Sequence, residues 1–308
     1  MKKQHRLLRL LSLALALCLL APLAACSKYR LEMSNEKESR TVLQLDGQDV
    51  PFEVLSFFYH NKPASADHEE KLAAAIRDTC ELYAIFSVCR DNGIDPFGEE
   101  MNARVDAAVR EMIDSFDTRR EYIDSLARRH MTDNTCRLLL RSYLCEARLL
   151  ESDMQEKMEE AILSFCASDE VVRVMALAVY YQDASLEDWA HARAEAILGM
   201  LALSPNTDEA FEEIAGSEAS FEAHNYLSLA QLRTLTGKGE DFTPALGYVS
   251  DALFEDGSFV ILRVTEKDLS YVEAHIPEIM PAYIDYLISE AIAPTASPLF
   301  PLCAADFA

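Results

Sequence analysis

The stretch VVRVMALAVYY, residues 171–181, decides how the chain is divided. It holds four valines, one charge at Arg173 and two closing tyrosines, and the polar run QDASLEDW follows it at residues 182–189. A short apolar run that is rich in β-branched residues and bounded by a turn is typical of a buried strand. Helix-like sequence precedes this run, so we expect the chain to change here from helices to a sheet.

Residues 169–268 have the pattern of a small α+β domain built around that strand. Ser185, with Asp188 three residues later, suits the N-cap of the first helix after it. The expected elements are, in order, a strand at 171–181, helices at 186–203 and 206–216, a loop-rich stretch to Gly247, and strands at 249–253 and 256–267.

Residues 41–165 have a helical pattern after an initial strand pair that turns at Asp46-Gly47. Pro51 suits the first position of a helix, and apolar residues at Leu72, Ile76 and Thr79 begin a stripe with helical spacing. The expected helices cover residues 51–61, 68–92, 98–116, 119–130 and 131–154, and the last of these places Cys136, Leu140, Tyr143, Ala147 and Leu150 on one face.

The C-terminal part contributes one more helix, expected at 276–291 within a segment that spans 269–292. Its apolar face is Ile276, Met280, Tyr283, Ile284 and Leu287. Residues 293–308, PTASPLFPLCAADFA with its preceding alanine, are proline-rich and are expected to form a loosely ordered tail. The fold class is therefore α+β, mostly helical at the N-terminal side.

The first 25 residues are expected to be a secretory signal peptide. A basic start, MKKQHR, precedes a long apolar run that ends in small residues. LAAC at residues 23–26 resembles the lipobox of bacterial lipoproteins, which implies cleavage before Cys26 and lipid on its sulfur. Residues 26–40 would then be a polar tether, and the protein would be extracytoplasmic and anchored to the cell membrane. An ordinary signal peptide with a chance cysteine is the alternative.

The net charge of −24 excludes nucleic acid as a partner. So acidic a surface repels phosphate backbones and anionic lipid headgroups, and it favours basic partners or simple solubility. Half of the residues are hydrophobic, so the chain is long and apolar enough to bury a core.

Six cysteines remain beyond the signal region: Cys80, Cys89, Cys136, Cys145, Cys166 and Cys303. Nine residues on one helix correspond to about 900° of rotation and roughly 13 Å of rise. Cys80 therefore cannot pair with Cys89, nor Cys136 with Cys145, whereas a disulfide between the two helices is feasible. The fifteen possible pairings leave the pattern open. The sequence has no CxxC or HxxxH, so we expect no metal and no cofactor.

The order of these parts resembles the SurA/PrsA type of extracytoplasmic foldase. The segments TVLQLDGQDVPFEVLSFFYHN, GIDPFGEEMNARV and YIDSLARRHMTDNTCRLLLRSYLCEARLL, within residues 41–165, are similar to its N-terminal chaperone domain. ASDEVVRVMALAV and ALGYVSDALFEDGSFVILRVTEK are similar to the start and end of a parvulin peptidyl-prolyl isomerase domain, here residues 169–268. The resemblance also implies that the segment 269–292 packs on the N-terminal domain.

The resemblance implies a peptide groove with two histidines near the twisting amide, and this sequence departs from it. The histidine positions fall on Ala176 and Val260, so no catalytic residue is expected. The groove candidates are Met175, Leu232, Phe242 and Phe259. His191 and His224 lie off the matched strands and are expected to be surface or helix residues.

We therefore expect a membrane-anchored chaperone that binds unfolded or nascent secreted polypeptides with a parvulin-like domain that has lost isomerase activity. Two alternatives stay open: an active peptidyl-prolyl isomerase with an altered site, and a non-enzymatic adaptor of one envelope complex. A homodimer is compatible with the sequence. No GxSxG or catalytic Cys-His pattern supports a hydrolase.

Overall fold

The protein is an α+β chain in which helices predominate, as expected from the sequence. The computed structural model describes residues 39–307 apart from 46, 64–65, 256, 293–297 and 300, and for 184, 218, 221–224 and 255 it describes the backbone alone. The predicted signal peptide, Cys26 and most of the predicted tether lie outside these residues.

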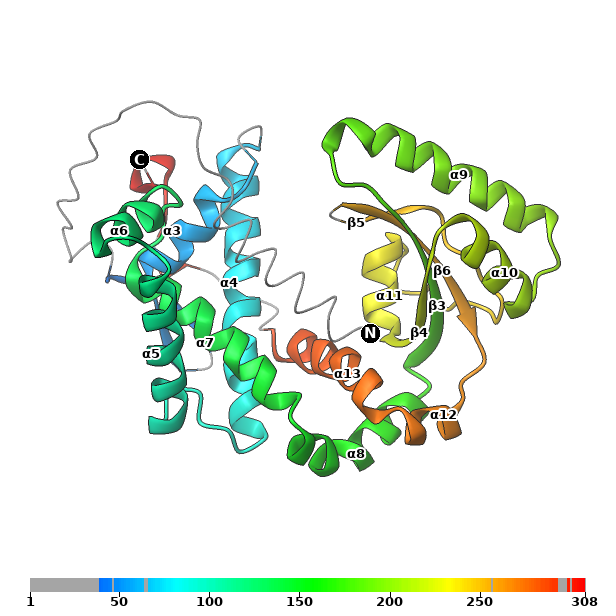
Figure 1. The fold of residues 1–308 in the computed structure, drawn as a ribbon, viewed down its shortest axis with the longest axis horizontal. Coiled ribbons are helices and arrows are strands. Elements are labelled where there is room, and N and C mark those ends of the chain that lie inside the picture. The colour runs from blue at the N-terminus through cyan, green and yellow to red at the C-terminus, as the bar shows by residue number, and fades with distance from the viewer. Residues whose placement is uncertain are drawn as a thin grey trace. The chain divides into compact units, whose positions relative to one another are not determined.

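The helical part begins with a hairpin and continues through six helices (Figure 1). Pro51 is the N-cap of the first helix and not its first helical residue. The elements are β1 (Thr41–Leu45), β2 (Gln48–Pro51), α3 (Phe52–His60), α4 (His68–Asp91), α5 (Glu99–Asp114), α6 (Arg119–Ala127), α7 (Asp133–Leu149) and α8 (Ser152–Ala167).

The long helix α4 is the centre of this part, and its sequence sets both of its ends. Asp67 accepts a hydrogen bond from the Glu70 backbone N–H at 2.9 Å, and the Glu70 side chain accepts one from the Asp67 N–H at 3.3 Å. This capping box satisfies two backbone donors at the helix start. Gly93, with φ +78°, takes the left-handed conformation just beyond the C-terminus.

The predicted helix at 131–154 is in fact two helices, α7 and α8. The backbone becomes extended at Glu151, with φ −70° and ψ 153°. Arg148 closes the corner with two hydrogen bonds to the Asp153 carboxylate at 2.8 and 2.7 Å. The most buried apolar residues of α7 near this corner are Cys145 and Leu149, and both lie outside the predicted face.

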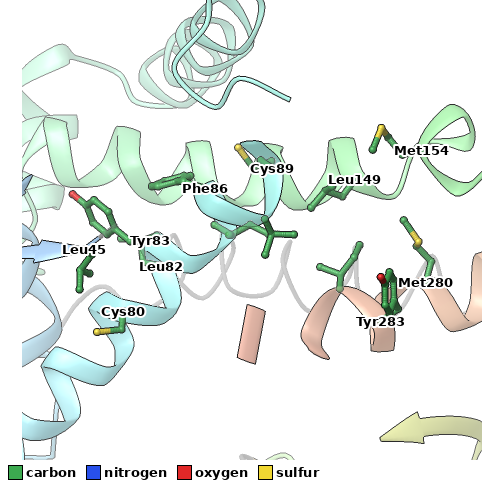
Figure 2. Close-up of a cluster of buried hydrophobic side chains, with 14 of the residues drawn as sticks. Leu45, Cys80, Leu82, Tyr83, Phe86, Cys89, Leu149, Met154, Met280 and Tyr283 are labelled. Atoms are coloured by element: carbon green, nitrogen blue, oxygen red, sulfur yellow. The ribbon is translucent and has the colours of Figure 1, made fainter. Parts of the chain in front are cut away.

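One hydrophobic core joins α4 to elements from both ends of the chain. Figure 2 shows Tyr83 and Phe86 of α4, Leu149 of α7, and Met280 and Tyr283 of the C-terminal helix directed into a common cluster. All five side chains are buried. The helical part therefore depends on residues that are synthesised last.

The second part is a four-stranded antiparallel sheet with the strand order β4-β3-β6-β5. Helices α9 and α10 pack on one face, and α11 packs on the other (Figure 1). The elements are β3 (Val171–Tyr180), η1 (Ala184–Leu186), α9 (Glu187–Leu203), α10 (Asp208–Glu218), β4 (Ser220–Ser228), α11 (Leu229–Thr236), β5 (Leu253–Glu255) and β6 (Ser258–Thr265).

Three sequence expectations for this part are wrong. The stretch expected to be loop-rich contains β4 and α11, and a capping box between Ser228 and Gln231 starts α11. The run at 249–253 makes an isolated bridge at Val249 before β5 begins. Ser185 is not an N-cap, because its backbone N–H donates to Asp183 at 2.8 Å in a turn that precedes α9.

The C-terminal part consists of α12 (Leu269–Ala274), α13 (Ile276–Ala291) and η2 (Ala304–Phe307). The helix predicted at 276–291 is confirmed, and α13 packs against α4 and α8. The tail is more ordered than expected where it is described. Leu302 and Phe307 are buried, and the Leu299 N–H donates to the Val42 carbonyl at 2.9 Å.

Candidate functional site

The two positions at which the family histidines are expected lie on one face of the sheet. Ala176 on β3 and Val260 on β6 are both buried in the cluster that α11 covers. Val260 pairs in register with Ala178, two residues from Ala176, so the two positions are diagonal neighbours. Leu232 of α11 and Phe242 belong to the same cluster. We call this cluster the α11 face.

The other two groove candidates lie on the opposite face. Met175 and Phe259 are buried beneath α9 and α10, in a cluster with residues such as Ile197 and Phe211. Successive side chains of a strand point to opposite sides, so Met175 cannot share a face with Ala176. The structure therefore brings together Leu232 and Phe242, and separates them from Met175 and Phe259.

The α11 face is apolar, and its described side chains include no histidine, carboxylate or thiol. A hydrogen bond beside this cluster connects α11 to the loop that follows it: Arg233 donates from Nε to the Phe242 carbonyl at 2.8 Å. Burial, and then the charge of Asp251, raises the pKa of Tyr248 in the same cluster. Such a face can pack a proline ring, and the side chains at positions 176 and 260 offer no hydrogen-bonding group to an amide that twists during isomerisation.

His191 comes nearer to a predicted groove residue than its sequence position suggests. Its ring centroid is 4.9 Å from that of Phe259, and its Nε2 is 3.8 Å from a carboxylate oxygen of Glu195. About half of its side chain is exposed. His191 therefore covers the edge of the α9 side of the sheet and does not reach the α11 face. The side chain of His224 lies outside the described residues.

A group of aromatic rings surrounds Phe259 at the end of the sheet. Phe254 of the edge strand β5 pairs in register with Phe259, with ring centroids 5.6 Å apart, and the Tyr181 ring lies 6.2 Å from it. We call Tyr181, His191, Phe254 and Phe259 the aromatic rim. Phe254 is 59% exposed, and β5 is the outermost strand of the sheet in the part of the chain that the structure describes.

More exposed apolar side chains follow at the start of α9. Trp189 is 59% exposed and Leu186 is 45% exposed. Both were expected to be ordinary helix residues, and the sequence gives no sign of their exposure. Exposed apolar side chains that gather into a patch are typical of surfaces that bind other proteins.

Acidic side chains surround these exposed residues. Asp183, Glu187 and Asp188 lie exposed in the turn and in the first turn of α9. Hydrogen bonds from Ser185 lower the pKa of Asp183. Glu195 adds a further carboxylate beside His191. These groups give the surface a negative potential that attracts basic segments.

The helical part has a concave site of its own, a cavity of about 390 Å³ that is open to solvent. The Arg141 guanidinium carbon lies 4.8 Å from the centre of the Phe97 ring, and its Nη1 donates to the Pro96 carbonyl at 2.5 Å. Burial raises the pKa of Tyr83 on the opposite wall. The lining is Gln48, Asp49, Pro51, Glu53, Tyr83, Phe97, Asn134, Arg137, Leu138 and Arg141.

The described residues contain no cluster of three or more histidine, cysteine, aspartate or glutamate side chains that could hold a metal ion. Within the same part of the chain, every helix is too short or too polar to cross a membrane.

No known family model matches the chain, and no curated protein matches its sequence. Solved structures give distant likenesses. The peptidylprolyl isomerase PrsA from Bacillus anthracis is 14% identical, with 70% of this chain and 95% of that chain covered and a TM-score of 0.25. The foldase protein PrsA from Streptococcus pneumoniae is 13% identical, with 87% and 97% covered and a TM-score of 0.28. PrsA from Bacillus subtilis is 12% identical, with 83% and 91% covered and a TM-score of 0.25. TM-scores this low do not establish a shared fold.

Proposed function

We propose that this protein is an extracytoplasmic chaperone that binds unfolded polypeptides and does not catalyse prolyl isomerisation. The observation that carries the proposal is the exposure of two large aromatic side chains, Phe254 of the aromatic rim and Trp189 of α9, which are each 59% exposed. Exposed aromatic side chains supply large contact areas to a partner at a low cost in conformational entropy.

The expected ligand is an unfolded segment that combines apolar and basic side chains. Phe254 and Trp189 would contact the apolar residues, and Asp183, Glu187 and Asp188 would attract the basic ones. Because these carboxylates are exposed, their attraction acts mainly on the association rate and is screened by salt. Binding should therefore weaken as ionic strength rises.

The composition of the α11 face supports the proposed lack of isomerase activity. The resemblance to parvulins assigns histidines to positions that are here Ala176 and Val260, and both side chains are buried and apolar. Without a group that bonds preferentially to the twisted amide, the face would bind the ground state and the transition state about equally, which does not accelerate the reaction.

The proposal includes attachment to the outer face of a membrane through lipid on Cys26. The supporting evidence is the sequence of residues 1–26, in which a basic start, an apolar run and LAAC follow one another. Two or three acyl chains make such an anchor stable. The aromatic rim would then meet secreted chains as they leave the membrane.

An aggregation assay with an unfolded secreted protein tests client binding. Replacing both Phe254→Ser and Trp189→Ser should weaken binding about 30-fold, which corresponds to roughly 2 kcal/mol for the loss of central aromatic contacts. Leu203→Ser is the matched control, because Leu203 is an apolar residue 91% exposed at the other end of α9. Equal affinities for the double variant and the control would refute binding at this surface.

A proline-peptide isomerisation assay tests the catalytic alternative, for which His191 beside Phe259 is the specific observation. We expect the same rate as in buffer. A rate above buffer that His191→Ala abolishes would instead establish an isomerase with an altered site. A rate above buffer that survives this substitution would also refute the proposed inactivity.

A further inference from the structure

Two buried cysteines from different helices are in direct contact in the core of the helical part. Cys89 lies on α4 and Cys145 on α7, and both are completely buried. A hydrogen bond joins their two thiols. Figure 2 shows Cys89 where α4 crosses α7, between Phe86 and Leu149. Both residues are free thiols in this structure.

We propose that Cys89 and Cys145 are a site of disulfide formation that links α4 to α7. The oxidant is a disulfide compound such as oxidised glutathione or a disulfide-bearing oxidoreductase. One thiolate attacks a sulfur of the oxidant, forms a mixed disulfide and releases one thiol. The second thiol then loses its proton and attacks the protein sulfur of that mixed disulfide, and the oxidant leaves as its second thiol. The two cysteines thus lose two protons and two electrons, and one disulfide of the oxidant is reduced to two thiols.

The hydrogen bond assigns different roles to the two sulfurs. The hydrogen bond donated by Cys89 lowers the pKa of Cys145, with Arg141 acting in the same direction against burial. The same hydrogen bond and burial raise the pKa of Cys89. In the reduced folded protein, Cys89 is thus the donor of this hydrogen bond and Cys145 is its acceptor.

Among the other cysteines that the structure describes, none is hydrogen-bonded to a second thiol. Cys80 is nine residues from Cys89, and Cys136 is nine from Cys145, so each points to the opposite side of its helix. Cys136 belongs to a separate cluster, where its sulfur is 3.8 Å from that of Met112. Cys303, whose thiol is exposed, donates a hydrogen bond to the Asp306 carboxylate in the C-terminal segment.

Burial decides when the bond can form. An oxidant cannot reach two completely buried sulfurs in the folded protein, so the reaction belongs to folding or to a transient opening of α4 from α7. Reduced folded protein should therefore react slowly with oxidised glutathione. Protein that refolds in the same reagent should acquire the bond, and the bond should then resist reductant until the protein is unfolded.

The test is peptide mapping of the full chain after refolding with oxidised and reduced glutathione. Free thiols are alkylated in denaturant, and the protein is then cleaved after arginine and lysine. Cys89 lies in the fragment 78–90, which also holds Cys80, and Cys145 lies in 142–148. A second cleavage after Glu81 separates Cys80 from Cys89. The same cleavage after glutamate cuts at Glu146, so we expect a cross-linked pair of fragments, 82–90 joined to 142–146, which reduction splits with the gain of two hydrogen atoms.

Variants provide the controls. Cys89→Ala and Cys145→Ala should each abolish the cross-link and leave the partner cysteine free to be alkylated. Cys166→Ala, at another buried thiol, should retain it. The wild-type map remains decisive if a variant does not fold. Complete alkylation of Cys89 and Cys145 after oxidative refolding, or a bridge from either to another cysteine, would overturn the proposal. Neither result bears on client binding, which the assays with Phe254 and Trp189 test separately.

Discussion

Replacing Asp208 by alanine removes the carboxylate that pairs with a buried guanidinium in the sheet domain. Arg263 of β6 has a side chain that is only 6% exposed, and its Nε donates to Asp208 at 2.7 Å. Asp208, in the first turn of α10, also accepts from the Thr265 hydroxyl. The pair therefore fixes α10 against the sheet whose edge carries the aromatic rim.

The structure sets the size of the effect. Removing one partner of a fully buried ion pair costs about 3–5 kcal/mol, because a charge is left buried without compensation. Asp208 is 40% exposed, and Arg263 keeps the Asn206 side chain, the Asn206 carbonyl at 3.1 Å and the Gly247 carbonyl at 3.3 Å as acceptors. The expected loss is therefore that of a charged hydrogen bond, about 2 kcal/mol.

Urea unfolding monitored by tryptophan fluorescence is the assay. Trp189 is the sole tryptophan and lies on α9, which packs on the sheet and on α10, so its signal reports on this domain. A loss of about 2 kcal/mol corresponds to a decrease in the midpoint of about 1 M urea at unchanged slope. Asp208→Asn, which keeps a neutral acceptor, should lose about half as much.

The control is an exposed ion pair of the same domain, in which Lys238 and Asp251 are 4.0 Å apart with side chains 41% and 87% exposed. Asp251→Ala should change the stability by less than about 0.5 kcal/mol. A midpoint that Asp208→Ala lowers no more than the control does would show that the burial of Arg263 does not make its carboxylate partner important for stability.

Three further results are expected. Tyr226→Phe should lower the free energy of unfolding in urea by about 1–3 kcal/mol. The buried hydroxyl accepts from the Asp268 N–H at 3.1 Å and donates to the Asp268 carbonyl at 3.3 Å, and both bonds are lost. An unchanged midpoint would contradict this. His60 has a lowered pKa, through burial and then the positive field of His130, so the folded state resists its protonation. Stability should be full above the ordinary value of about 6.5 and fall as pH decreases below it, and His60→Gln should flatten the melting temperature between pH 7 and 5; an equally steep profile would exclude His60. Phe307→Ala should lower the free energy of unfolding by roughly 3 kcal/mol and expose the C-terminal segment to proteolysis. The reason is that this buried ring stacks on the Tyr59 ring, with centroids 4.0 Å apart. Unchanged cleavage kinetics would show that other contacts hold the segment.

Local patterns predicted the elements whose signal is strong in the sequence itself. The strand at Val171–Tyr180 and the helix at Ile276–Ala291 follow directly from composition and periodicity. The corner between α7 and α8 has no glycine or proline, and it is held by the contact between Arg148 and Asp153, which a pattern of apolar residues does not reveal. The strand β4 was missed because pairing with β3, far away in the sequence, defines it.

The candidate site was predictable in part. The alternation of side chains along a strand already places Met175 and Ala176 on opposite faces, so a single groove lined by both Met175 and position 176 could have been excluded. The S-x-x-Q capping box at Ser228 was also visible in the sequence. The exposure of Phe254 was not, because it depends on β5 being the edge strand.

The position of α13 in the core of the helical part has a consequence for the order of folding. Met280 and Tyr283 fill the same cluster as Phe86 of α4, although about two hundred residues of chain separate them. A chain that crosses a membrane from its N-terminus delivers α4 long before α13. The apolar side of α4 must then wait in water until the last helix arrives, and contacts of such long sequence separation form slowly. Under the proposed function, the exported chain would itself pass through the kind of aggregation-prone state that it would relieve in others.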